Sequence, residues 1–278
     1  MRTSLKAFLN AHDRVYQVSL THVKGSSPRE VGATLYVATD ALWGTIGGGQ
    51  LEFMAIDEAR RMQRDGTVTR DMTVPLGPEI GQCCGGVVTL RFSMLDAQAQ
   101  ALAKQQETKE IDARPAVYVF GAGHVGRALC AALALLPLRV CVIDSRADEL
   151  ALVAGDVEQR CSPLPEAEIR SAEPGCAYVI LTHDHALDFL LVREALLRGD
   201  AAYVGMIGSK SKRATFSHWL KQEVGVDADA YLQNLTCPIG AGGSKDKRPA
   251  VVAAMVAAEV MTMFDVCPVL ESTNPTDA

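Results

Sequence analysis

The sequence has no excess of positive charge, no long uninterrupted apolar run and no C-x-x-C pair of cysteines. Its formal net charge of −6 gives no general electrostatic attraction for nucleic acid or for anionic membrane surfaces. The first residues, MRTSLKAFLNAHDR, lack the apolar core of a signal peptide, and Glu259 interrupts the most apolar later stretch. We therefore expect a soluble cytoplasmic protein that uses neither nucleic acid nor a membrane as its partner.

The cysteines do not follow the pattern of a disulfide scaffold, because eight of them are spread over 278 residues without an export signal. Cys130, Cys141 and Cys176 lie in apolar segments, where cysteine packs as a small hydrophobic residue. Cys83 and Cys84 are different, since they stand side by side between glycines in GPEIGQCCGG. Adjacent cysteines cannot readily supply a tetrahedral metal site or a thioredoxin-like pair, which leaves sulfur chemistry or packing.

Strand parity predicts which of the two adjacent cysteines is accessible. If the following strand buries Leu90 and Phe92, even-numbered residues face the core, so Cys84 is structural and Cys83 is the more reactive thiol. A bulge at the glycines that follow would reverse this assignment.

A polar stretch over residues 96–114 divides the chain and indicates a linker that is partly helical. Residues 1–95 combine strand-like and helix-like patterns and predict a mixed α+β domain. In residues 115–278, short apolar strands alternate with helix-length segments, which predicts a Rossmann-like, doubly wound parallel sheet.

The second half carries a glycine-rich turn, FGAGHVGRAL, directly after an apolar strand. Gly121, Gly123 and Gly126 follow the G-x-G-x-x-G spacing, and Asp144 ends the next strand, where Rossmann domains place an acidic residue for a ribose hydroxyl. We expect a nucleotide or another phosphate-bearing ligand there, the alternative being a purely structural turn. If the ligand is a nicotinamide dinucleotide, Asp144 favours NAD over NADP.

Four further stretches could hold an anionic or polar ligand. Glycines 47 to 49 precede a helix and predict unobstructed backbone donors, and the stretch YVGMIGSKSKR places basic residues at another helix start. Tight loops and a serine-capped helix with solvated basic residues are the structural alternatives. The candidate residues of these stretches are Lys24, Arg29, Gly47, Gly48, Gly49, Gln50, His183, His185, Gly208, Ser209, Lys210, Lys212 and Arg213.

Taken together, eight motifs resemble the XdhC/CoxI family. They are VKGSSPREVG, GTIGGGQLE, GQCCGG, VFGAGHVGRAL, VIDSR, LTHDHALD, YVGMIGSKSKR and CPIG, in the order found in the family. The resemblance spans nearly the whole chain and implies an N-terminal XdhC/CoxI domain, a C-terminal Rossmann domain, a homodimer and a cytosolic bacterial setting.

The resemblance also implies a function. Such proteins bind the molybdenum cofactor, molybdopterin, keep it while a cysteine desulfurase exchanges an oxo ligand for a sulfido ligand, and deliver it to xanthine dehydrogenase. They act as chaperones rather than as catalysts. The residues that the family motifs make candidates for the cofactor site are Gln82, Cys83, Cys84, Gly121, Gly123, His124, Gly126 and Asp144, with Cys83 as a contact to the bound molybdenum.

Two other functions stay open at this stage. One is an NAD-dependent oxidoreductase with an N-terminal substrate domain, in which His124, His183 or Lys210 acts as acid or base. The other is a nucleotide sensor without chemistry. The chain also departs from the family near the C-terminus, where residues 249–253 read PAVVA instead of a stretch with an acidic pair. That departure argues against a role for carboxylates there.

Overall fold

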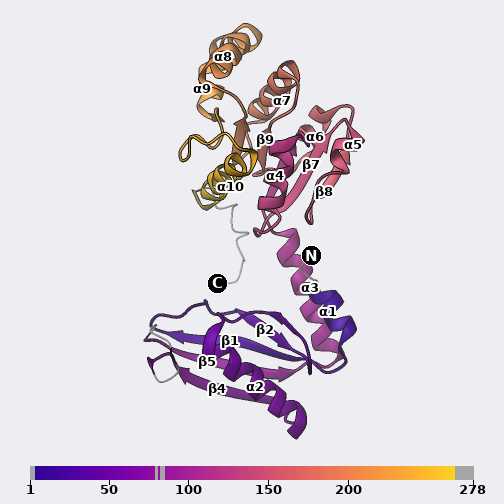
Figure 1. Cartoon of the computed structure of the whole chain (residues 1–278), viewed down its shortest axis with the longest axis vertical. Coiled ribbons are helices and arrows are strands. Elements are labelled where there is room, and N and C mark those ends of the chain that lie inside the picture. Colours follow the sequence, from indigo (N-terminus) through magenta and orange to yellow (C-terminus); the bar gives the residue numbers. More distant parts are fainter. Residues whose placement is uncertain (1–3, 79–80, 82–84, 267–278) are drawn as a thin grey trace, which may run out of the picture. The chain divides into compact units, whose positions relative to one another are not determined.

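The computed structural model describes residues 4–78, residue 81 and residues 85–266. The chain forms two compact units, which divide between Lys109 and Glu110 (Figure 1). Among the described residues, no helix has the length and apolarity that crossing a bilayer requires.

The first unit is built on a five-stranded antiparallel sheet in the order β3-β2-β1-β5-β4. Helix α2 covers one face of this sheet, and Leu51, Ala55 and Met62 of α2 pack into the same core as Val18 and Leu20. Helix α1 packs in a smaller core at the end of the sheet. The elements are α1 (Leu5–Ala11), β1 (Tyr16–Lys24), β2 (Thr34–Val37), β3 (Leu42–Gly44), α2 (Gly49–Asp65), β4 (Thr69–Pro75) and β5 (Val87–Met94).

Strand β5 has the parity predicted from its sequence. Leu90 and Phe92 are fully buried, whereas Arg91 is exposed. Cys83 and Cys84 lie outside the described residues, so the assignment of the reactive thiol stays a prediction. Leu76 and the glycines at the start of β5 close the base of the hairpin, because Leu76 exchanges hydrogen bonds with Gly85 and Gly86 at 2.8 and 2.7 Å.

The polar stretch between the two halves forms a helix, α3 (Ala97–Asp112), in which no residue is buried. Asp96 caps its start by accepting a hydrogen bond from the Ala99 N–H at 2.7 Å. Glu107 of α3 accepts hydrogen bonds from the N–H groups of Leu5 and Lys6 at 2.7 and 3.1 Å. The apparent linker therefore stabilises the N-terminal end of α1.

The second unit is a six-stranded, fully parallel sheet in the order β11-β10-β9-β6-β7-β8. Counted from β6, this is the 3-2-1-4-5-6 order of a dinucleotide-binding Rossmann fold, as predicted. The strands are β6 (Ala116–Phe120), β7 (Arg139–Asp144), β8 (Glu158–Cys161), β9 (Ala177–Ile180), β10 (Tyr203–Met206) and β11 (Leu235–Thr236).

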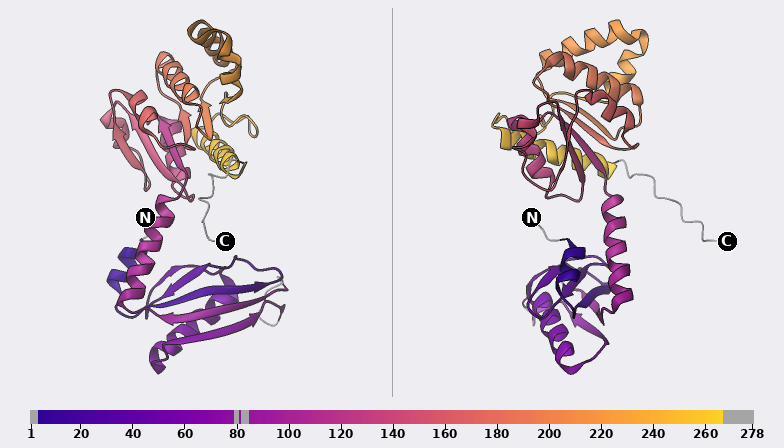
Figure 2. Two further views of the ribbon diagram at one scale, coloured as in Figure 1. Left: turned by 180° about the vertical axis from the view of Figure 1, so that it is seen from behind. Right: turned by 90° about the vertical axis from the view of Figure 1, so that its right-hand side faces the viewer.

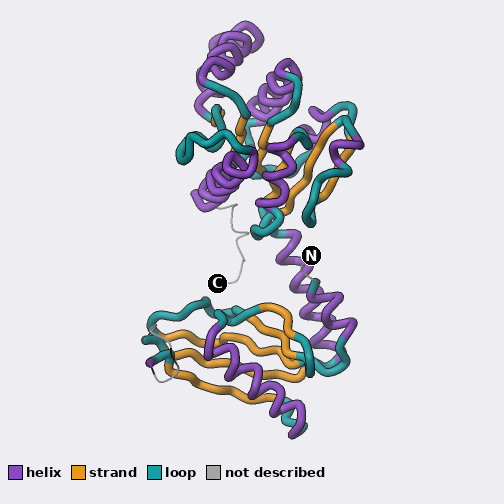
Figure 3. Tube along the Cα trace, viewed as in Figure 1, coloured by secondary structure: helices purple, strands orange, loops and turns teal. Residues whose placement is uncertain are grey.

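Helices cover both faces of the parallel sheet (Figures 2 and 3). Tyr118 and Phe120 of β6 point into the core under α6, α7, α8 and α9, while Val117 and Val119 point into the core under α4, α5 and α10. The helices are α4 (His124–Leu133), α5 (Ala147–Leu150), α6 (Pro165–Ser171), α7 (His185–Arg198), α8 (Lys210–Val224), α9 (Ala228–Gln233) and α10 (Pro249–Val266).

The three cysteines assigned to packing are buried, which confirms that prediction. Burial raises the pKa of Cys130 and of Cys141 to about 12, so both thiols are protonated at neutral pH. Of the cysteines in the described part of the chain, Cys161 is the one exposed to solvent.

Candidate functional site

The glycine-rich turn joins β6 to α4. Its three glycines differ in whether the surrounding atoms leave room for a side chain. A Cβ atom on Gly121 would lie 2.5 Å from the carbonyl oxygen of Leu181, and one on Gly126 would lie 1.9 Å from that of Gly121. Gly121 also has a φ of +115°, in the region that favours glycine. These two glycines are therefore required by the fold itself.

The fold does not require a glycine at position 123. The φ of −68° at this position suits any residue, and nothing lies within 4 Å of the place where a Cβ would stand. Gly123 is also the N-cap of α4, and no side chain caps this helix. The first N–H groups of α4 are therefore without a capping side chain, and together with the positive end of the helix dipole they suit an anion. His124, at the first helical position, is exposed.

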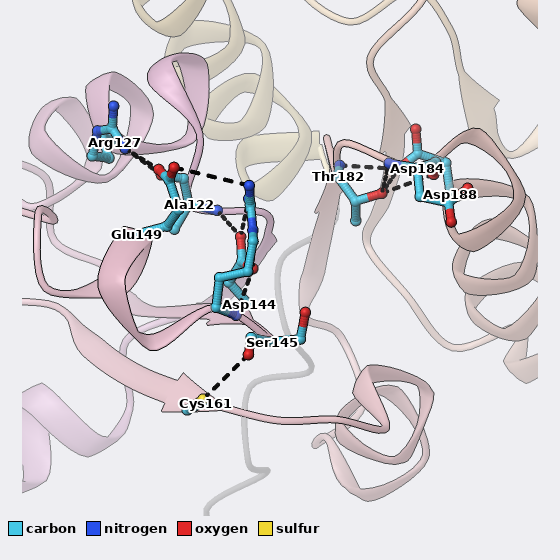
Figure 4. A network of polar contacts seen from close by, with 10 residues as sticks. Ala122, Arg127, Asp144, Ser145, Glu149, Cys161, Thr182, Asp184 and Asp188 are labelled. Carbon is cyan, nitrogen blue, oxygen red and sulfur yellow. Dashed lines mark hydrogen bonds and ion pairs between the residues drawn. The ribbon is translucent and has the colours of Figure 1, made fainter.

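Asp144 lies directly behind this turn and is bound on both carboxylate oxygens (Figure 4). Its Oδ2 accepts hydrogen bonds from the Ala122 N–H and from Arg146 Nη2, both at 2.8 Å. Its Oδ1 accepts from the Arg146 N–H and Nε, both at 3.0 Å. Burial by itself raises the pKa of Asp144, but the bonds from Arg146 and Ala122 outweigh it and lower the pKa to about 2.

The carboxylate predicted to bind a ribose is thus already bonded to the glycine turn and to a neighbouring arginine. The inferred preference for NAD over NADP stays an untested prediction. Arg127 completes the clamp on the turn, because its Nη1 donates to the Ala122 carbonyl at 3.0 Å and pairs with Glu149 (Figure 4). Both backbone polar groups of Ala122 are therefore held by charged side chains, which fixes the turn in place.

The motifs LTHDHALD and YVGMIGSKSKR meet through a buried ion pair. Asp188 of α7 is fully buried and accepts hydrogen bonds from the Thr182 N–H and hydroxyl at 3.0 and 2.7 Å (Figure 4). Its other oxygen pairs with Lys212 of α8. Two loops at the carboxyl ends of β9 and β10 are therefore tied together.

This arrangement restricts the anion site predicted at the start of α8. Lys212 is engaged with Asp188, and Arg213 donates to the carbonyl oxygens of Leu235 and Leu232 at 2.6 and 3.2 Å. Ser209 caps α8 by accepting from the Lys212 N–H at 3.3 Å. The observed N-cap matches the structural alternative, but Lys212 and Arg213 are not solvated as that alternative supposed. Exposed candidates that remain are His183, His185 and Lys210.

A pocket of about 260 Å³ lies at the carboxyl ends of β6, β7, β8 and β9. Gly121, Asp144 and Thr182 line it, together with the loop that precedes α6 and the first turns of α7. The pocket therefore adjoins the glycine turn, at the point of the sheet where the strand order reverses. Open α/β sheets place their ligands in this position.

In the first unit, the glycine-rich loops are packed against one another. A Cβ on Gly86 would lie 2.1 Å from the Ser26 carbonyl oxygen, and a Cβ on Gly47 would lie 2.7 Å from Pro28 Cγ. Ser26 and Gly85 form a β-bridge. The structure thus brings VKGSSPREVG and GTIGGGQLE together beside the glycines that follow Cys84, whereas Gln82, Cys83 and Cys84 lie outside the described residues.

The prediction of unobstructed donors at glycines 47 to 49 is wrong for Gly47 and Gly48. The N–H groups of Ile46 and Gly48 donate to Glu52 Oε2 at 3.0 and 3.2 Å, and the N–H of Gly47 donates to Thr45 Oγ1 at 3.1 Å. Glu52, in the first turn of α2, reaches back over its own helix start as in a capping box. Its acidic side chain in the first turn was the sequence signal for this role. Gln50 is exposed.

Comparison with known proteins agrees with both units. A family model described as the XdhC Rossmann domain matches residues 117–260, and one described as the XdhC and CoxI family matches residues 8–73. The chain belongs to the XdhC/CoxI family. The glycine turn, the side chains that hold Ala122 and the adjoining pocket all lie within the residues that match the XdhC Rossmann domain.

Two individual proteins are similar to this XdhC/CoxI-family chain. The uncharacterized protein YqeB of Escherichia coli (strain K12) is 26% identical over 257 residues, which cover 88% of this chain and 42% of YqeB. The chain therefore spans less than half of that relative. A crystal structure of a xanthine dehydrogenase from Bacillus halodurans has a TM-score of 0.78 at 16% identity, with 98% of each chain covered. The two proteins share their fold.

Proposed function

We propose that the protein binds the molybdenum cofactor, keeps it while a cysteine desulfurase supplies the terminal sulfido ligand, and delivers it to xanthine dehydrogenase. Membership of the XdhC/CoxI family supports a role in the maturation of that enzyme. The observation that carries the proposal is Gly123, whose open backbone stands at an uncapped helix start. This glycine is not needed by the fold, so its openness suits the approach of a phosphate.

The described residues fit such a cargo in two places. The cofactor is a pterin that carries a phosphate, and the start of α4 offers free N–H groups and a positive dipole end for that phosphate. In the first unit, Ser27 Oγ is buried and has no hydrogen-bond partner among the described residues. Because a buried hydroxyl without a partner is costly, it suits a polar ligand held between the packed glycine loops.

The sulfur-handling part of the proposal concerns Gln82, Cys83 and Cys84. Gly85 and Gly86 follow Cys84 in the sequence and pack against Ser26 and Gly25. The last two glycines of the family motif GQCCGG therefore lie at the loop that carries Ser27. We propose that Cys83 contacts the molybdenum or its incoming sulfur, and that the protein works as a homodimer.

Binding of the cofactor can be tested directly. The purified protein is mixed with molybdenum cofactor released from a donor enzyme, separated by gel filtration, oxidised and assayed for pterin fluorescence. We expect the pterin to elute with the protein and the Gly123→Ala variant to retain about tenfold less, since a methyl group fills the open space. Gly242→Ala, which adds a methyl group at another open glycine with an unstrained φ, should bind as the wild type.

A second function is favoured by the strand order, which is that of dinucleotide-binding enzymes. An NAD-dependent oxidoreductase would bind NADH at the same turn, although both oxygens of Asp144 are already bonded. The same samples distinguish the two functions. If no pterin elutes with the wild-type protein while NADH quenches its fluorescence, the chaperone proposal fails and the oxidoreductase replaces it.

A further inference from the structure

The pocket beside the glycine turn has two apolar walls from different parts of the second unit. One wall is formed by Pro163 and Leu164, between β8 and α6, and by Pro165, the first residue of α6. Leu187 and Leu190 of α7 form the other. The two prolines have a fixed φ and so make a rigid surface. A slot between two apolar surfaces suits a flat ring better than a branched or charged group.

Each wall contains one leucine that is exposed to solvent. Leu164 is 61% exposed and Leu190 is 48% exposed, although each lines the same small cavity. Exposed leucines that converge on a pocket lose contact with water when an apolar surface enters between them, which favours binding.

The polar groups of the pocket are few and are of two kinds. Asp144 is paired with Arg146, and Thr182 is bonded to Asp188, so both have partners within the protein. Glu166, in the first turn of α6, also lines the pocket, and its carboxylate can accept hydrogen bonds from the N–H groups of a ring. Ser145 and His183 are exposed and can form hydrogen bonds to the edge of a ring. Apolar faces with polar groups at one edge match a nitrogen heterocycle.

The size of the pocket limits what enters it. Its volume of about 260 Å³ lies below the roughly 300–1,000 Å³ of pockets that enclose a drug-sized ligand. One ring system fits, and the rest of the ligand must lie outside. Gly121 lines the pocket and is two residues from Gly123, so the remainder of the ligand is directed along the open glycine turn.

We propose that this pocket binds the planar nitrogen heterocycle of a ligand whose phosphate lies on the glycine turn. Two sources supply that chemistry, the pterin of the molybdenum cofactor and the base of a nucleotide. The inference rests on the proposed function for the pterin and is independent of it for the nucleotide.

The experiment uses the full chain and three probes in calorimetric titrations. They are AMP, the pterin phosphate obtained by oxidising the molybdenum cofactor, and inorganic phosphate alone. Leu190→Glu places a charge in the wall of the pocket without disturbing the core, since Leu190 is half exposed. Leu197→Glu is the matched control, because Leu197 lies on the same helix, is 38% exposed and does not line the pocket.

We expect AMP or the pterin phosphate to bind at least about tenfold more tightly than inorganic phosphate, and Leu190→Glu to remove that advantage while Leu197→Glu keeps it. The inference is overturned if neither ring-bearing probe exceeds inorganic phosphate, or if Leu190→Glu binds as the wild type or no worse than Leu197→Glu. If AMP binds and the pterin phosphate does not, the pocket inference stands while the proposed function loses its ligand. Binding of the pterin phosphate supports both.

Discussion

The ionised carboxylate of Asp144 helps to fix the conformation of the glycine-rich turn, because it accepts a hydrogen bond from the Ala122 N–H. Its pKa of about 2 lies below the value of about 3.9 expected in an unfolded chain. A depressed pKa means that the folded protein favours the ionised carboxylate. The resulting stabilisation is complete above about pH 4 and is lost as the pH falls toward 2.

Replacing Asp144 by Asn should therefore reduce the free energy of unfolding at neutral pH, by about 1–2 kcal/mol once the partial exposure of Arg146 is taken into account. Urea denaturation from pH 7 to pH 3 measures the difference between the two proteins. Other carboxylates with lowered pKa values, such as Glu58 and Asp200, are common to both and cancel. A difference that stays constant below pH 4 would contradict this role of Asp144.

The buried pair of Asp188 and Lys212 makes a second prediction at this scale. Lys212→Met leaves Asp188 fully buried with its Thr182 bonds but without a cation, which should cost about 3–5 kcal/mol. The double variant Asp188→Asn with Lys212→Met should lose less, because no unpaired charge remains. Urea denaturation of the single and double variants tests this. A double variant less stable than Lys212→Met would show that the pair is not the main contribution.

At the level of elements, the turn between β6 and α4 contains glycines that the fold requires and one glycine, Gly123, that it does not require. Gly126→Ala forces a methyl group against the Gly121 carbonyl and should destabilise the protein by about 1–3 kcal/mol. Gly123→Ala should leave the unfolding free energy nearly unchanged, since its methyl group meets nothing. Thermal unfolding followed by circular dichroism compares the two. Equal destabilisation would mean that Gly123 also serves the fold.

In the same unit, the sequence predicts the buried strands but not the strands at the two edges of the sheet. Strands β6, β7, β9 and β10 are buried on both faces, so their continuous apolar runs identified them. The edge strands β8 and β11 were not foreseen. Glu158–Cys161 has no fully buried residue and Leu235–Thr236 is very short, so both depend on pairing with a neighbouring strand.

The candidate site could be predicted only where its signal is local in the chain. The spacing of the glycines located the open turn and placed Asp144 near it. The bond from the Ala122 N–H to Asp144 and the engagement of Lys212 by Asp188 depend on tertiary geometry that spacing does not encode. The pocket walls were missed as well, because Pro163 and Leu190 are ordinary residues until the fold brings β8 and α7 to the same edge of the sheet.

At the scale of the whole chain, the two units have separate cores. The core residues of the first unit, with the residues packed on them, lie between Leu5 and Ala103, and those of the second lie between Ala116 and Phe264. Each unit therefore meets the main requirement for folding alone. Helix α3 belongs with the first unit, since its Glu107 holds the start of α1.

A fragment of residues 113–278 should therefore fold and keep the proposed ligand site of the Rossmann unit, because the glycine turn, Asp144 and the pocket all lie within it. We expect it to bind AMP or the pterin phosphate with the dissociation constant of the full chain. Fragment 1–112 should fold without binding AMP. Circular dichroism establishes folding and calorimetric titration measures binding. A folded 113–278 fragment that binds neither probe, while the full chain does, would mean that the first unit completes the site.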